Sequence, residues 1–178
     1  VSLKGSDWLR LEKIAEAQAT VGDIREALQT TATISDQGAQ ASALRAIAEA
    51  QAKASDTKGA LKTAGMILDQ DVKASVLNSI AEAQVTAGDV EGAFQTAATI
   101  TPQNAKVWAL GAIAEAQART GDTKGALQTA TTISDQWAKV FALSAIAETQ
   151  AKAGDRAGAA GTFRLAVQTA ATIPDAEQ

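Results

Sequence analysis

Apolar residues recur in one pattern five times along the chain, with a constant 33-residue period. In the fourth copy, Val107, Leu110 and Ile113 stand three residues apart, which places them on one face of a helix. A second apolar set in that copy predicts a second helix, and its members are Ala126, Leu127, Ala130 and Ile133. Each copy therefore predicts a pair of helices, and no segment has the two-residue alternation of a strand.

The repeat is also visible in residue identity. The pentapeptide Ile-Ala-Glu-Ala-Gln begins at Ile14, Ile47, Ile80 and Ile113, and Ile-Ala-Glu-Thr-Gln begins at Ile146. Eight residues after each Ile comes a Gly, which predicts a left-handed turn, and then an Asp, which predicts the N-cap of the second helix. Ser55 is the exception at the Gly position. Glu26, three residues after Asp23, predicts a capping box in the first copy.

These signals predict an all-α protein, a right-handed α-solenoid of five helix-turn-helix repeats forming a single domain over residues 1–178. Asp7 is expected to cap a first helix whose Trp8 and Leu11 face inward. The last helix is expected to be about two turns longer than its counterparts, because the final copy holds seven extra residues. The predicted repeats span about 5–37, 38–70, 71–103, 104–136 and 137–178.

The repeat resembles the tetratricopeptide (TPR) family, which also pairs helices, at a period of about 34 residues, with small residues at fixed places. In the fourth copy, Leu110, Ile113 and Ala114 would take the places of the family's Trp, Leu and Gly. Gln117 stands where the family usually has Tyr, and the repeat-ending Pro is mostly absent. The chain is therefore described as TPR-like, a divergent 33-residue form. Ankyrin shares the period, but its Thr-Pro-Leu-His turn does not occur here.

Composition excludes much chemistry. The chain has no His and no Cys, which excludes imidazole bases, Cys nucleophiles, zinc sites built on these residues and disulfides. Phosphate-binding glycine motifs, EF-hand loops and nucleophile elbows are absent from the sequence. We therefore expect a non-enzymatic protein with no cofactor and no metal.

The net charge is −4, from 16 Lys and Arg against 20 Asp and Glu, without a basic cluster. Neither nucleic acid nor an anionic membrane is an expected partner. No run of 18 apolar residues occurs. A soluble chain is expected, with any N-terminal targeting segment absent or removed and its compartment left open.

The resemblance implies a binding surface on the concave face of the solenoid, which the first helices of the repeats line. In the fourth repeat it would be lined by Trp108, Gly111, Glu115, Ala118 and Arg119. The equivalents of Glu115 form a column, which consists of Glu16, Glu49, Glu82, Glu115 and Glu148. Five aligned carboxylates are suited to a basic peptide.

The same carboxylates have an alternative reading, as members of solvated ion pairs with a cation four residues on. Those pairs are Glu49–Lys53, Glu115–Arg119 and Glu148–Lys152. No cation stands four residues after Glu16 or Glu82, and Glu12 adds charge near the first of them. The amino-terminal part of the surface is therefore expected to be the more acidic.

The aromatic residues cluster in the second half of the chain. Trp108 and Phe141 occupy equivalent positions of adjacent repeats, where they either form an exposed pair or pack into the neighbouring helix. Trp137 is expected to cover the loop between repeats.

Two polar columns accompany the core. The first, on the packed side, is expected to bond to backbone carbonyls or to adjacent repeats, and it consists of Gln18, Gln51, Gln84, Gln117 and Gln150. The second is expected to bond back to helix carbonyls, and it consists of Thr30, Thr63, Thr96, Thr129 and Thr169.

The sequence thus favours a protein- or peptide-binding module. Two alternatives remain: a self-associating scaffold in which Trp137 and the last helix contact another copy, and an excised or engineered segment of a larger repeat protein.

Overall fold

The computed structural model describes residues 7–101 and 103–173. This part of the chain is all-α, with ten helices and no strand, which confirms the predicted fold class. The outer ends of the first and last predicted repeats, together with Pro102, lie outside the described residues.

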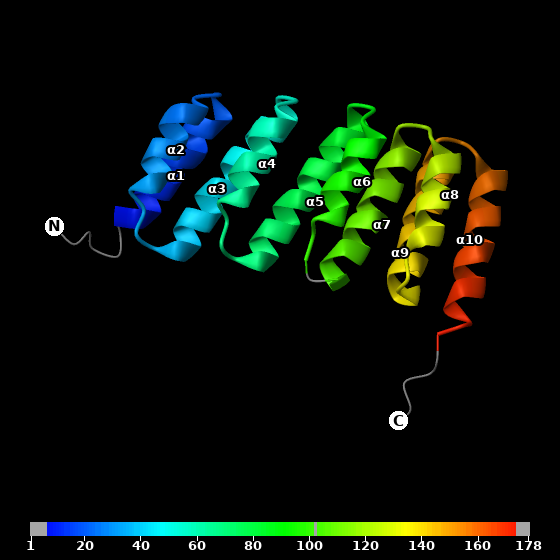
Figure 1. The fold of residues 1–178 in the computed structure, drawn as a ribbon. Helices are drawn as coiled ribbons and strands as arrows, with labels where there is room; N and C mark the ends of the chain where they lie inside the picture. The colour runs from blue at the N-terminus through cyan, green and yellow to red at the C-terminus, as the bar shows by residue number, and fades with distance from the viewer. Residues whose placement is uncertain (1–6, 102, 174–178) are drawn as a thin grey trace. The chain divides into compact units, whose positions relative to one another are not determined.

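The helix bounds reproduce the 33-residue period (Figure 1). The first helices of the repeats are α1 (Asp7–Thr20), α3 (Gln37–Lys53), α5 (Gln70–Thr86), α7 (Gln103–Arg119) and α9 (Gln136–Lys152). The second helices are α2 (Ile24–Ala32), α4 (Thr57–Gly65), α6 (Val90–Ala98), α8 (Thr123–Thr132) and α10 (Arg156–Ala170). The prediction of a longer last helix is confirmed, because α10 has 15 residues and α8 has 10.

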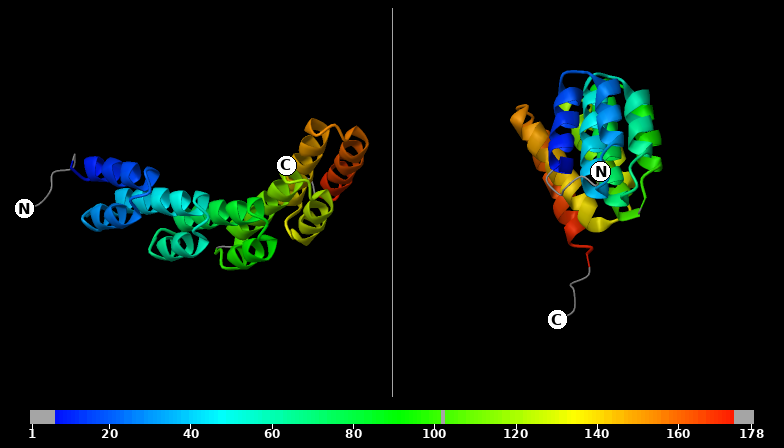
Figure 2. Two further views of the ribbon diagram at one scale, coloured as in Figure 1. Left: turned by 90° about the horizontal axis from the view of Figure 1, so that it is seen from above. Right: turned by 90° about the vertical axis from the view of Figure 1, so that its left-hand side faces the viewer.

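The contacts divide the chain into two compact units, Val1–Ala87 and Gly88–Gln178. In the first unit α1 packs on α2 and α3, and α3 packs on α4 and α5. In the second unit α7 packs on α8 and α9, and α9 packs on α8 and α10. First helices therefore lie side by side in each unit, with the second helices as another layer (Figure 2). Within each unit the helix pairs stack in chain order, as in an α-solenoid.

The predicted helix faces are confirmed by burial. Ile113 and its equivalents Ile47, Ile80 and Ile146 are fully buried. Ile14 occupies the same column but is 48% exposed, because α1 is the first described helix and receives no helix pair on that side. Trp8 and Leu11 pack inward against a core cluster, as predicted for the first helix.

The turns between paired helices also follow the prediction. Gly121 has φ = +90°, in the left-handed region, and Ser55 adopts φ = +62° at the equivalent position. The N–H of the following Asp then donates to a carbonyl five residues back, as in Asp122 N to Gln117 O at 2.9 Å. In the first, second, fourth and fifth repeats this bond ends the first helix and places the Asp at the start of the second.

The buried Gln column bonds differently from the prediction. In the second repeat, Gln51 Oε1 accepts a hydrogen bond from Thr63 Oγ at 2.7 Å, and Gln51 Nε2 donates to Asp56 Oδ2 at 3.1 Å. Asp56 Oδ1 accepts from the N–H of Gly59 at 2.9 Å and so caps α4. The expected bonds to carbonyls or to adjacent repeats are wrong here, because the facing helix of the same repeat already supplies both partners.

The same arrangement recurs in the fourth and fifth repeats, and it corrects the Thr column. Thr129 Oγ donates to Gln117 Oε1 at 2.6 Å, rather than to a helix carbonyl. In the last repeat Thr162 takes this role with Gln150, at 2.7 Å. Thr169, the expected member of the column, bonds back to a carbonyl in α10. The expected bond is therefore present at Thr169, but Thr162 and not Thr169 is the equivalent of Thr129, because the extra residues of the last repeat follow Thr162.

The first repeat lacks the cap, and the predicted capping box is wrong. Asp23 makes no side-chain capping bond, and Glu26 Oε1 instead accepts from Arg25 at 3.0 Å. That hydrogen bond lowers the pKa of Glu26. The other repeats have Gly at this position, and a Cβ built on Gly59 would overlap Asp56 Oδ2 and Gln51 Nε2. A side chain at this position therefore competes with the cap.

Candidate binding surface on the first helices

Trp108 on α7 and Phe141 on α9 form an exposed aromatic pair. Their ring centroids are 5.7 Å apart and the ring planes meet at 46°. The two side chains remain 50% and 57% exposed. Of the two readings of these residues, the exposed pair is therefore the one present in the structure.

The pair forms because α7 and α9 approach closely and in register. The two residues stand one repeat apart, so adjacent helices carry them at the same level. Ala109 and Ala142, the next residue on each helix, are buried. A Cβ built on Gly111 would meet the Cβ of Ala142 at 3.9 Å, so small residues line this contact. Small side chains between the helices bring the larger rings on the outer surface within contact distance.

Trp137 lies beside the same pair at the start of α9. It is 59% exposed and, with Trp108, lines an open groove of about 620 Å³. The other residues that line the groove are Gln103, Val107, Ser134 and Asp135. Ser134 and Asp135 belong to the loop between repeats, beside which Trp137 was expected to lie. Asp135 Oδ1 accepts from Ala138 N at 2.8 Å and caps α9. We call Trp108, Trp137 and Phe141 the aromatic patch.

Two carboxylates follow the aromatic patch along the same helices. Glu115 and Glu148 stand seven residues after Trp108 and Phe141, respectively, and two helical turns return a side chain to nearly the same face. Glu115 is half-buried and Glu148 is exposed. Arg119 is also exposed, in the last turn of α7. Ala118, however, is buried in the core cluster of this unit, so its assignment to the surface is wrong.

The remaining members of the Glu column, Glu16, Glu49 and Glu82, are half-buried in the first unit. In the described part of the chain Glu49 and Lys53 do not form an ion pair, and neither do Glu148 and Lys152. The alternative interpretation of the Glu column, as ion pairs with a cation four residues on, is therefore wrong for Glu49 and Glu148.

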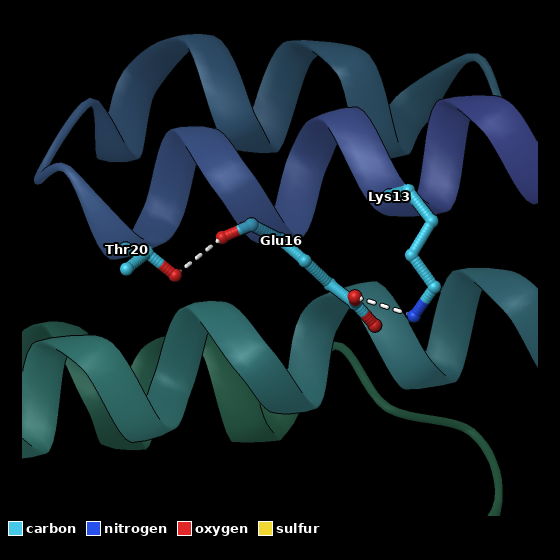
Figure 3. Close-up of polar contacts among 3 residues, drawn as sticks. All are labelled: Lys13, Glu16 and Thr20. Atoms are coloured by element: carbon cyan, nitrogen blue, oxygen red, sulfur yellow. Dashed lines mark hydrogen bonds and ion pairs between the residues drawn. The ribbon is translucent and has the colours of Figure 1, made fainter.

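Glu16 has a partner that the sequence pattern did not reveal. Lys13 Nζ lies 2.6 Å from Glu16 Oε2, and this hydrogen bond raises the pKa of Lys13 (Figure 3). The hydroxyl of Thr20 donates to the backbone carbonyl of Glu16 at 2.9 Å. Glu12, one turn earlier, is buried. The contact with Lys13 thus occupies the Glu16 carboxylate, at the end of the surface that was expected to be the more acidic.

Sequence reasoning missed the groove itself. A related groove of about 430 Å³ lies in the first unit, two repeats earlier, and it is lined in part by Gln37, Ala41, Leu68 and Asp69. The signal available in the sequence was Asp135, which stands two residues before Trp137 at the start of the last repeat's first helix. In both grooves the capping Asp, Asp69 or Asp135, lies in a loop next to the start of the preceding first helix.

Two other kinds of site are not observed among the described residues. Within residues 7–101 and 103–173, no group of three or more Asp or Glu side chains is placed to hold a metal ion. A search of the described helices also finds none with the length and apolarity needed to cross a membrane.

Comparison with known proteins adds no assignment: no family model, no curated protein and no solved structure matches this chain.

Proposed function

We propose that the chain is a non-enzymatic protein- or peptide-binding module, and that it binds through the aromatic patch together with Glu115 and Glu148. The observation that supports this proposal is the exposure of three large aromatic side chains at neighbouring positions. Exposed aromatic groups are typical anchors at protein interfaces, because each buries a large area when a partner covers it. A TPR-like chain would also bind through its first helices.

The charges favour a basic partner. The chain carries a net charge of −4, and Glu115 and Glu148 lie on the helices that carry the aromatic patch. Complementary charge raises association rates and discriminates against acidic partners. Arg119, at the far end of α7, would lie outside the contact with the basic segment.

The proposal is tested by selecting a random peptide library against the immobilised chain and measuring the affinity of the enriched peptides. Binding is expected to be lost in the Trp108→Ala/Phe141→Ala variant. Leu165→Ala is the matched control, because Leu165 is a similarly exposed apolar residue, 47%, on α10 of the same unit. Equal binding by all three proteins, or failure to enrich any peptide, would contradict the proposal.

A second candidate, a self-associating scaffold, is favoured by the exposed apolar residues of α10. Phe163 and Val167 are 41% and 68% exposed and stand one helical turn apart. In the proposed scaffold, this face packs against another copy, with Trp137 contributing to the same contact. Sedimentation at several protein concentrations tests it: association should rise with concentration and disappear in Phe163→Ser/Val167→Ser. A monomer at every concentration would exclude the scaffold.

A further inference from the structure

We propose that the groove lined by Trp108, Trp137 and Asp135 is the subsite for an arginine side chain of the bound peptide. This inference rests on the proposed function and specifies the chemistry of the partner. The groove joins two indole rings to a carboxylate, a combination that suits a cation with hydrogen-bond donors.

The indole rings provide the first attraction. A cation placed against the face of a Trp ring is attracted by the ring's electron density, and the attraction grows as water is excluded. Both indoles are about half exposed and therefore accessible to a ligand. Phe141 contacts the ring of Trp108 and so supports one wall of the groove.

Asp135 provides the second attraction. Its Oδ1 accepts the capping bond from Ala138 N, whereas its Oδ2 has no hydrogen-bond partner among the described residues. Gln103 and Ser134 add neutral polar groups to the lining. Lys106 and Lys139, on the same two helices, do not line the groove. The free carboxylate oxygen therefore gives a cation an acceptor without a competing positive charge in the lining.

The polar lining distinguishes between cations. A quaternary ammonium group has no N–H to donate, so it would leave Asp135 without a hydrogen bond. Lysine donates but is a compact, strongly hydrated charge. The planar guanidinium of arginine stacks on an aromatic ring and also donates to a carboxylate from its edge. Arginine is therefore the side chain that uses both parts of the groove.

The first unit supplies an internal comparison. Its groove has a capping carboxylate at the equivalent position, Asp69, but Ser42 and Asp71 stand where the second unit has Trp108 and Trp137. Asp69 Oδ1 accepts from two backbone N–H groups, those of Asp71 and Val72. The first unit thus has the loop and the carboxylate without the indoles, and we expect it not to bind the peptide.

The position of the second acidic group predicts the spacing of the ligand. Glu115 lies seven residues after Trp108, roughly 10 Å along the helix axis. An extended peptide covers this distance in about three residues. The proposed ligand is therefore an extended segment with an arginine and a second basic residue three positions away.

The test uses a synthetic decapeptide of Gly and Ser that contains one Arg and one Lys three positions apart, together with a version in which citrulline, the neutral isostere, replaces Arg. Binding is followed by the NMR shifts of the indole N–H groups. Those of Trp108 and Trp137 should move, and that of Trp8 in the first unit should not. Citrulline should weaken binding by about tenfold or more, since hydrogen bonds between charged groups are the stronger ones.

Two variants complete the test. Asp135→Asn should weaken binding of the Arg peptide by about tenfold while keeping the helix cap, because Asn is an equally good N-cap. Asp69→Asn, the matched change in the first unit, should leave binding unchanged. Equal binding of the Arg and citrulline peptides, or competition by tetramethylammonium as strong as by arginine amide, would overturn the arginine subsite.

The outcomes separate this inference from the proposed function. If library peptides bind through Trp108 and Phe141 but do not respond to citrulline or to Asp135→Asn, the arginine subsite is wrong and the binding module stands. If no peptide binds at all, both are wrong.

Discussion

Gln51 and Asp56 are joined by two hydrogen bonds, one between backbones and one between side chains. The carbonyl of Gln51 accepts from the N–H of Asp56 at 2.8 Å, and Gln51 Nε2 donates to Asp56 Oδ2 at 3.1 Å. The first bond ends α3 and the second holds the carboxylate that caps α4. One Gln–Asp pair thus sets both the turn and the helix that follows it.

We predict that Gly158→Ala destabilises the chain relative to Gly161→Ala, a matched change in the same helix. A Cβ at Gly158 would overlap Asp155 Oδ2 and Gln150 Nε2, whereas a Cβ at Gly161 meets nothing. Losing the cap costs about 1 kcal/mol, and Ala in a free helical position gains about 0.5–1 kcal/mol. Urea unfolding followed by circular dichroism measures both. Equal stabilisation by the two changes would show that the cap contributes nothing.

Thr129→Val should cost about 1–3 kcal/mol, because it leaves the buried Oε1 of Gln117 without its donor. Thr131→Val is the control, since the Thr131 hydroxyl is exposed and bonds to a nearby carbonyl. Its effect should stay within about 0.5 kcal/mol. The free energies of unfolding of the two variants are compared in urea, and a neutral Thr129→Val would mean that water replaces the bond.

Ile113→Ala should cost about 2–5 kcal/mol, as expected for a fully buried side chain whose removal leaves a cavity. Ile14→Ala, in the same column, should cost clearly less, because Ile14 is half exposed. Thermal and urea unfolding report the difference. A change of less than about 0.5 kcal/mol at Ile113 would contradict the packed face described for α7.

Ser55→Gly should stabilise the chain by about 0.5–1 kcal/mol, since Ser55 is a non-glycine residue held at positive φ. Ala54→Gly is the control, because Ala54 has φ = −80° and gains nothing from Gly. The melting temperatures of both variants are measured by circular dichroism. A lower melting temperature for Ser55→Gly would contradict the turn geometry.

Helices, turns and core faces could be predicted because the residue pattern for each of them recurs five times in the sequence. The apolar spacing around Ile113 does not by itself fix which helix face is buried. The same spacing recurs in every repeat, and this recurrence identifies the buried face. The left-handed turn was predictable at Ser55 for the same reason, although Ser55 itself gives no turn signal.

Side-chain partners could not be predicted in this way. The Gln117–Thr129 bond joins residues 12 apart on facing helices, and a periodic pattern does not say which polar groups meet across the turn. Ala118 was misplaced because adjacent residues on a helix point about 100° apart. Glu16 was expected to lack a cation because only the residue four positions later was considered, whereas Lys13 precedes it.

Because the polar network joins residues of one repeat only, whole repeats can be added or removed without breaking it. In the second, fourth and fifth repeats, the bonds among Gln, Thr, Asp and Gly span at most 12 residues. Deleting or duplicating one full repeat length removes or adds a whole network, so no Gln amide of the remaining networks loses its partners. Recombination within the coding sequence can therefore lengthen or shorten the protein while every polar group of these networks keeps its partner.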